Sequence, residues 1–152
     1  NACKISINND KIYIKSTGIG NSLGFIKTAP YPGYPTDLQT PLVAYASTLS
    51  GMTIVQEGVF SSRFNQIAEL KKMGADLTVI KNRVVIEGVK RLYGAKVKAL
   101  DLRGGAGMVI AGLKAVGETI IENAEIIERG YYDLEGKLRA LGANVKKVPN
   151  ET

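Results

Sequence analysis

Four charged residues occupy matching places in a sequence that repeats itself. A segment of seven residues returns in related form 66 residues further along the chain, and the same shift carries Arg63 onto Arg129 and Asp37 onto Arg103. Repeated units use most of their residues for packing, so charged residues at matching positions are candidates for function. The carboxylate of Asp37 can accept a proton, and the three guanidinium groups can bind phosphate or carboxylate anions.

The composition narrows the chemistry that these residues can perform. The chain has no histidine and a single cysteine, Cys3. A Ser-His-Asp triad and a histidine-based metal site are therefore excluded, and we expect neither a metal nor a cofactor. Cys3 lies in an alternating apolar segment with no basic cluster to activate it, so we interpret it as a packing or surface residue.

Asp37 follows a loop that is rich in proline. Three prolines between residues 30 and 35 keep this loop extended and deliver Asp37 to the expected start of a helix. One interpretation is an N-cap or first-turn carboxylate that the helix dipole favours. The other is a general base that is held rigidly at a cleft. The two roles can coexist.

The arginines also lie near expected helix starts. Arg103 opposes the helix dipole, and Gly104 and Gly105 beside it leave backbone N–H groups accessible, a combination that suits an anion site. Taken one at a time, Arg63, Arg103 and Arg129 can equally be solvated surface residues. Together, three arginines at matching positions suit a ligand that carries both a phosphate and a carboxylate.

The bulk properties indicate one soluble domain. The chain has 152 residues and a net charge of +6, which fits either a basic soluble surface or an anionic ligand. No dense Lys/Arg stripe with interleaved aromatic residues is present, which argues against nucleic acid as a partner. No apolar run reaches the ~20 residues of a membrane span, and no signal peptide opens the sequence. We therefore expect a cytoplasmic protein that does not bind membranes.

The repeat predicts an α/β fold built from β-α-β-α-β-β units. We expect one domain, 1–152, that holds the tail of one unit at about 1–15 and two further units at about 22–88 and 94–150. The strands are expected at 25–27, 53–56, 96–100, 119–122 and 145–148, with hairpins whose turns lie at 8–10 and 81–82. The helices are expected at 37–50, 65–73, 103–116 and 131–141.

Helix character indicates how these elements are layered. Residues 38–50 and 104–113 carry no charge, so the first helix of each unit is expected to be buried all round, with the sheets outside. The second helices are amphipathic. Gly74 and Gly142 are expected to end those second helices in the positive-φ conformation that glycine tolerates.

Several motifs resemble one known family. The segments 32–39, 58–64, 101–103 and 129–131, together with 138–143, closely resemble UDP-N-acetylglucosamine 1-carboxyvinyltransferases, the enolpyruvyl transferases of peptidoglycan synthesis. The resemblance covers about 3–148 and implies an inside-out α/β barrel with helices inside and sheets outside. It also implies that the chain is most of one domain of a two-domain enzyme. The partners implied are phosphoenolpyruvate, UDP-N-acetylglucosamine and the other domain of the same enzyme.

The resemblance assigns roles to the site residues. Asp37 matches the general base at the sugar 3′-hydroxyl, and Asp101 matches a second acidic residue near the reacting carbons. Three arginines and two apolar residues match substrate contacts: Arg63 and Arg103 for the phosphoenolpyruvate carboxylate, Arg129 for its phosphate, and Val59 and Phe60 for the UDP-sugar.

The chain departs from the family pattern at two places and lacks one part of the family's site. The chain has Ser61-Ser62 where the family usually has Glu-Asn, and it has glycines at 104, 105 and 107 in place of Ala-Ser-Ala-Ser, which is expected to loosen a helix start. The family's catalytic cysteine belongs to the other domain. The isolated chain is therefore expected to fold but not to turn over. Because the face toward the other domain would be rich in arginine and hydrated, we expect a monomer.

Two alternatives remain open from the sequence. The shikimate-pathway enolpyruvyl transferase shares the fold and the use of arginines. A non-enzymatic module that binds nucleotide sugars would share the fold alone.

Overall fold

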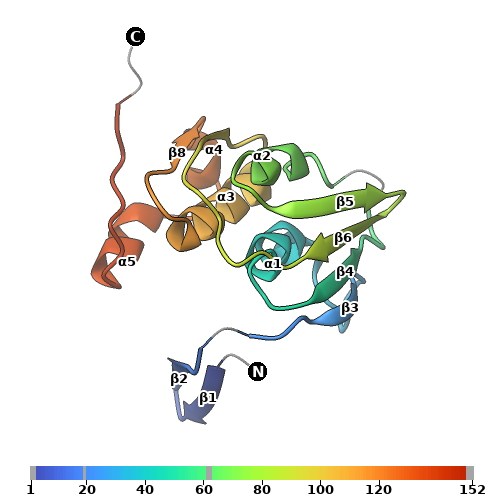
Figure 1. Ribbon diagram of the computed structural model, residues 1–152. Coiled ribbons are helices and arrows are strands. Elements are labelled where there is room, and N and C mark those ends of the chain that lie inside the picture. The colour runs from blue at the N-terminus through green and yellow to red at the C-terminus, as the bar shows by residue number, and fades with distance from the viewer. Residues whose placement is uncertain (1–2, 19, 61–62, 150–152) are drawn as a thin grey trace.

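The computed structural model describes residues 3–18, 20–60 and 63–149. Within this part of the chain, the strands form a separate hairpin, a four-stranded sheet and a two-stranded sheet (Figure 1). The hairpin consists of β1 (Cys3–Asn8) and β2 (Lys11–Ser16), which pair antiparallel.

The first full unit follows the expected order of elements. Its members are β3 (Gly24–Lys27), a 3-10 turn η1 (Thr36–Leu38), α1 (Gln39–Ala46), β4 (Met52–Gln56), α2 (Ile67–Lys72), β5 (Asp76–Ile80) and β6 (Arg83–Glu87). The sheet order is β3-β4-β6-β5, in which β3 and β4 are parallel and the other pairs are antiparallel.

The second unit repeats part of this plan. Its members are β7 (Lys96–Lys98), α3 (Leu102–Lys114), β8 (Ile120–Glu122), α4 (Glu125–Glu128) and α5 (Leu134–Ala140). Strands β7 and β8 are parallel, as are β3 and β4. The repeat in the sequence is therefore a repeat of structure.

The uncharged helices lie inside, as predicted, but they are not buried all round, since Tyr45 of α1 and Leu113 of α3 are 36% and 47% exposed. Helices α1 and α3 pack against each other, with β4 against α1 and with β7 and β8 against α3 (Figure 1). The core between them includes Val43 and Ala44 of α1 and Met108 and Ala111 of α3, all of which are fully or almost fully buried. The sheets lie outside these helices, but they do not close into a barrel within the described residues.

The glycines of α3 are contact points, so the expectation that they loosen the helix start is wrong. Helix α3 begins regularly at Leu102. A Cβ added at Gly107 would lie 2.8 Å from the Cγ2 of Thr40 on α1, and one added at Gly104 would lie 2.1 Å from the Nε2 of Gln66. The missing side chains therefore allow α1 and the segment before α2 to approach α3 closely.

The predicted turns and helix ends are confirmed. Gly74 and Gly142 have φ values of +87° and +92°, and they follow α2 and α5. The turns at Asn9 and Lys81 join β1 to β2 and β5 to β6.

The two hairpins carry the same apolar face, but only one of them is covered. Ile5 pairs with Ile14 on the first hairpin as Leu77 pairs with Ile86 on the second. Leu77 and Ile86 are buried, whereas Ile5 is 61% and Ile14 is 69% exposed. Figure 1 shows the β1–β2 hairpin standing apart from the body. Its apolar face is therefore a surface without a partner in the described part of the chain.

The end of the second unit differs from the prediction in three ways. Helix α5 buries none of its residues, the short helix α4 precedes it, and the strand expected at 145–148 is absent from the described residues. In the first unit, β5 pairs only with β6. The β5–β6 hairpin and α2 contribute buried side chains to the same hydrophobic core. No described strand after α5 corresponds to β6, so residues 145–148 have no ladder partner and α5 has no cover.

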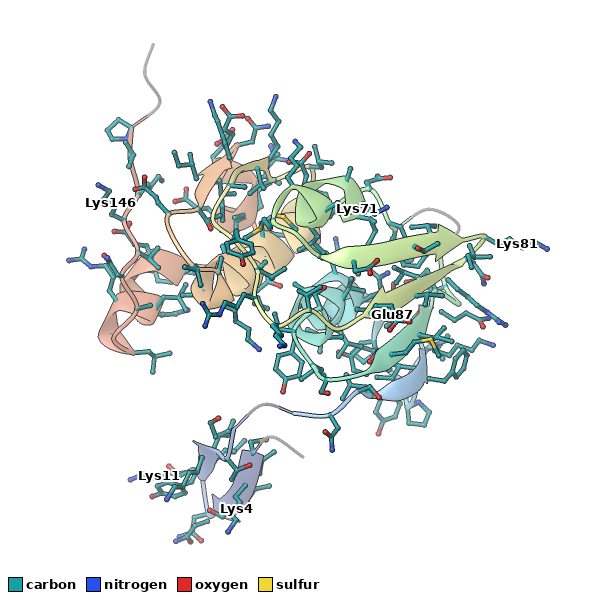
Figure 2. The ribbon with its side chains drawn as sticks, viewed as in Figure 1. Lys4, Lys11, Lys71, Lys81, Glu87 and Lys146 are labelled. Atoms are coloured by element: carbon teal, nitrogen blue, oxygen red, sulfur yellow. The ribbon has the colours of Figure 1, made fainter. Side chains whose placement is uncertain are left out.

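The basic side chains are spread over the molecule. The labelled lysines in Figure 2 project outward from the hairpin, from α2, from the β5–β6 turn and from the segment after α5. No helix in the described part of the chain has the length and apolar character needed to cross a membrane.

Candidate active site

The two repeats meet at Asp37. The carboxylate oxygen Oδ1 of Asp37 accepts a hydrogen bond from Arg103 Nε at 2.6 Å and another from Arg63 Nη1 at 3.1 Å. Asp37 and Arg103 are the residues that the 66-residue shift superimposes, so equivalent positions of the two units contact each other directly. The prediction that these charged residues belong together is consistent with this contact.

The local backbone explains how Asp37 reaches the arginines. Pro35 holds φ −70° and ψ 133°, and the chain then turns through η1 before α1 begins. No side chain caps η1 or α1, so the interpretation of Asp37 as an N-cap is wrong, although it does lie in the first turn. Its side chain is 60% exposed and points to the guanidinium groups instead of the helix N–H groups.

The ion pairs shift the pKa values of Asp37 and Arg103. The hydrogen bond from Arg103, followed by that from Arg63, holds the pKa of Asp37 below its ordinary value. The same contact raises the pKa of Arg103. Asp37 is therefore ionised at neutral pH and is a weaker base than a free aspartate while both arginines hold it.

Asp101 has a structural role that the sequence analysis did not assign. Its Oδ1 accepts hydrogen bonds from the backbone N–H groups of Arg103 at 2.9 Å and Gly104 at 2.8 Å, which makes it the N-cap of α3. Its Oδ2 accepts from Gln66 Nε2. This cap fixes the backbone of Arg103, since Arg103 is the second residue of α3.

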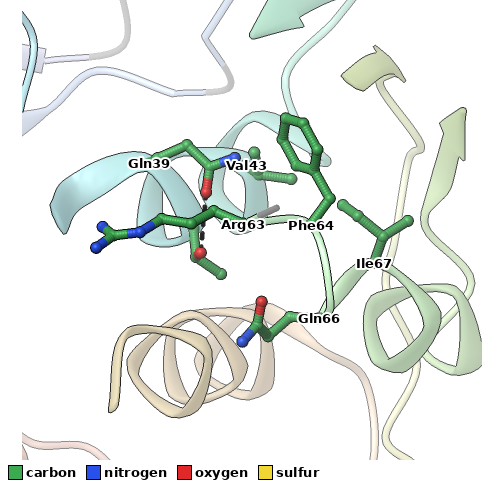
Figure 3. Close-up of a pocket in the computed structure, with 7 residues that line it drawn as sticks. Gln39, Val43, Arg63, Phe64, Gln66 and Ile67 are labelled. Atoms are coloured by element: carbon green, nitrogen blue, oxygen red, sulfur yellow. Dashed lines mark hydrogen bonds between the residues drawn. The ribbon is translucent and has the colours of Figure 1, made fainter. Parts of the chain in front are cut away.

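Arg63 is held on two sides. Its guanidinium carbon lies 4.0 Å from the centre of the Phe60 ring, a cation–π contact, and its Nη1 also donates to Thr36 Oγ1 at 3.1 Å. Figure 3 shows Arg63 extending past Gln39 along a narrow crevice. The residues that line this crevice are Gln39, Thr40, Val43, Arg63, Phe64, Gln66 and Ile67.

Arg129 lies apart from this cluster. It closes the short helix α4 and precedes α5, the second helix of its unit, as Arg63 precedes α2. Its side chain is exposed, and among the described residues it forms no hydrogen bond or ion pair. The structure therefore brings together Asp37, Arg63 and Arg103, and it leaves Arg129 outside.

Val59 and Phe60 line a separate open hollow of about 420 Å³ beyond the end of β4. Both side chains are partly exposed, at 40% and 48%. The hollow also contains Glu57, which is 3% exposed and which the sequence analysis missed. Its position directly after a buried strand and before Gly58 is the signal that could have identified it.

Comparison with known proteins places this chain in a family. Residues 3–138 match the family described as EPSP synthase (3-phosphoshikimate 1-carboxyvinyltransferase). The chain belongs to this family. Among solved structures, it is similar to the enolpyruvyl transferase NikO from Streptomyces tendae, with a TM-score of 0.83 and 24% identity over 95% of this chain and 33% of that one. It is also similar to EPSP synthase from Acinetobacter baumannii, with a TM-score of 0.70 and 23% identity over 97% of this chain and 35% of that one. These structural similarities confirm the predicted enolpyruvyl transferase fold.

Curated relatives carry a more specific name. The chain is 47% identical over 140 residues to UDP-N-acetylglucosamine 1-carboxyvinyltransferase from Desulfofundulus thermocisternus, covering 92% of this chain and 57% of the relative. It is 48% identical over 141 residues to the protein of the same name from Clostridium botulinum (strain ATCC 19397 / Type A), covering 93% and 34%. The predicted resemblance is therefore confirmed. The chain spans between about a third and about three fifths of the length of these relatives.

Proposed function

We propose that the chain is part of a cytoplasmic transferase of peptidoglycan synthesis. In this proposal, the enolpyruvyl group of phosphoenolpyruvate is transferred to the 3′-hydroxyl of UDP-N-acetylglucosamine, and phosphate leaves. The observation that carries the proposal is the contact of Asp37 with Arg63 and Arg103, a carboxylate beside two anion-binding groups. The names of the curated relatives support the choice of substrates.

The proposed roles follow from the chemistry of these groups. Asp37 accepts the proton of the attacking hydroxyl, whose oxygen then bonds to the carbon that bears the phosphate. Arg63 and Arg103 bind the carboxylate of phosphoenolpyruvate, because a guanidinium fork matches a carboxylate. Arg129 binds the phosphate from a separate position, and Val59 and Phe60 contact the UDP-sugar. Asp101 acts by fixing the start of α3.

The other domain of the same enzyme is proposed to complete the site. The exposed apolar face of the β1–β2 hairpin supports the presence of further segments, since the matching face of the β5–β6 hairpin is buried. Leu141 after α5 is 84% exposed, whereas Met73 at the matching position after α2 is fully buried.

A chimera tests the proposed function. The matching segment of the Clostridium botulinum relative is replaced by this chain, and phosphate release is measured with phosphoenolpyruvate and UDP-N-acetylglucosamine. We expect turnover within about tenfold of the intact relative, and none from the isolated chain. Turnover with shikimate 3-phosphate in place of the UDP-sugar would support the shikimate-pathway alternative. Binding of the UDP-sugar without turnover by the chimera would support a non-enzymatic module.

The arginine contacts predict an exchange of partners when phosphoenolpyruvate binds. In the free chain, the lowered pKa of Asp37 means that its ion pairs are complete above the ordinary aspartate pKa and are lost as the pH falls through the lowered value. If a ligand carboxylate binds Arg63 and Arg103, these two arginines no longer pair with Asp37 and no longer lower its pKa. We therefore expect saturating phosphoenolpyruvate to raise the pKa of Asp37, measured by ¹³C NMR titration of its carboxyl carbon.

Inorganic phosphate at equal ionic strength is the control for this exchange, because it lacks the carboxylate. An unchanged Asp37 titration, with shifted signals from both arginine side chains to show that phosphoenolpyruvate is bound, would contradict the exchange. Such an exchange would make the base strongest when the anionic substrate is in place.

A further inference from the structure

Glu57 is a buried carboxylate that the proposed chemistry does not use. It is 3% exposed, and each of its oxygens accepts hydrogen bonds. Oε1 accepts from Thr28 Oγ1 at 2.7 Å and from the backbone N–H groups of Val59 at 2.8 Å and Phe60 at 3.2 Å. Oε2 accepts from Thr36 Oγ1 at 2.9 Å. These donors join the end of β3, the start of η1 and the segment after β4.

The surroundings of Glu57 favour an ionised carboxylate. The contacts above come from donors, and an ionised carboxylate is an acceptor only. Burial acts to raise the pKa of Glu57, but the hydrogen bonds from Thr28, Val59, Phe60 and Thr36 outweigh it, so the pKa lies below its usual value. The negative charge is therefore stabilised by fixed dipoles without an ion pair to a described residue.

Thr36 connects Glu57 to the active-site arginine. A hydroxyl group has one proton, and Thr36 donates it to Glu57. The Thr36 oxygen is therefore left as an acceptor, and Arg63 Nη1 donates to it at 3.1 Å. The same Nη1 donates to Asp37 Oδ1 at 3.1 Å. The charge of Glu57 thus fixes the direction of the hydrogen bond that orients Arg63 next to the base.

A second path reaches Arg63 from the other oxygen of Glu57. Oε1 holds the backbone of Val59 and Phe60, and the Phe60 ring lies under the Arg63 guanidinium. Both sides of Arg63 are therefore fixed by one buried side chain. Glu57 also lines the hollow that contains Val59 and Phe60.

We propose that Glu57 is a positioning residue that holds Arg63, and through it Asp37, in a fixed place relative to the Val59–Phe60 segment. The positioning of Arg63 and Asp37 by Glu57 does not depend on which reaction the protein catalyses. Its importance for catalysis rests on the proposed function. Glu57 does not touch the reacting atoms.

Substitution of Glu57 by glutamine tests this role. Glutamine keeps the size of the side chain but places an NH₂ donor in the network, either against the Thr36 hydroxyl or against the two backbone N–H groups. In the first case, the Thr36 hydroxyl loses its hydrogen-bond acceptor. Its oxygen is then no longer reserved for the hydrogen bond from Arg63. In the second, Phe60 loses its anchor. In either case, Arg63 is released, and the proton affinity of Asp37 is expected to rise by at least about threefold, which is half a pKa unit.

The measurement is ¹³C NMR titration of the Asp37 carboxyl carbon in the isolated chain without ligand. Glu87→Gln is the matched control, because Glu87 is exposed at the end of β6 (Figure 2) and its loss removes the same charge. Thr36→Val removes only the connecting hydroxyl and is also expected to raise the proton affinity of Asp37. This second variant keeps the test valid if Glu57→Gln does not fold. The proposal would be overturned if the pKa of Asp37 in a folded Glu57→Gln variant and in Thr36→Val equals that in Glu87→Gln.

The chimera adds a kinetic readout. Glu57→Gln is expected to lower kcat by about tenfold, and Glu57→Asp is not expected to restore it, because the shorter side chain cannot reach both groups of donors. An inactive chimera would contradict the proposed function. The positioning role of Glu57 would still be tested separately, because the NMR titration needs no substrate.

Discussion

Asp37→Asn is expected to lower the kcat of the chimera by about 10³-fold, within the range that general bases contribute. The amide cannot accept the proton of the attacking hydroxyl, although it fills the same space. Because asparagine carries no charge to pair with Arg63 and Arg103, these arginines become more available to the substrate carboxylate. The KM for phosphoenolpyruvate is therefore expected to stay constant or to fall while kcat collapses.

Asp10→Asn is the control for this prediction, because Asp10 is exposed in the turn of the β1–β2 hairpin and its loss changes the net charge equally. Initial rates at varied phosphoenolpyruvate concentration give kcat and KM for both variants. A kcat for Asp37→Asn within threefold of the control would show that another group takes the proton.

Gly88→Ala is expected to produce the largest loss of stability. A Cβ at this position would lie 1.5 Å from the backbone oxygen of Leu49 and 3.2 Å from that of Gly51, and backbone atoms cannot rotate away as a side-chain end can. The Gly88 N–H also donates to Gly51 O at 3.1 Å, so the two segments are already fixed at close range. We expect the free energy of unfolding to fall by about 3 kcal/mol, at the upper end of overpacking costs.

Thermal unfolding followed by circular dichroism measures this effect, and the expected fall in Tm is about 10 °C for a chain of this length. Gly112→Ala on α3 is the matched control. There the added Cβ would meet only side-chain atoms of Thr119, at 3.3 Å or more. Equal Tm values for the two variants would show that the chain at Gly88 shifts without cost.

The sequence predicted the repeated units because their signals are local. Apolar periodicity, uncharged helices and glycines after helices each depend on neighbouring residues, and α1, α2, α3 and both hairpins lie where these signals indicated. The strand expected at 145–148 had the same local signal and did not form. A strand also needs a partner along its edge, and no local pattern reports whether one is present.

The site was predicted less completely, for a related reason. The spacing of 66 residues identified Asp37 and Arg103 as equivalent, but it could not reveal that one donates a hydrogen bond to the other. Glu57 was missed because its importance comes from Thr28 and Thr36, which lie 29 and 21 residues away. The shift also matched Arg129 to Arg63, but Arg129 ends the short helix α4 and lies apart from the cluster around Asp37.

The contact between Asp37 and Arg103 has a consequence for the history of the chain. Directly after a duplication, the two units carry identical residues, and identical charges at these positions would have repelled each other at 2.6 Å. The attraction seen now exists because the two copies carry opposite charges at this position. Once the copies differed, the same corner of the fold could supply a proton acceptor from one unit and an anion-binding group from the other. The two units thus meet through an asymmetric contact, although the scaffold on either side of it is repeated.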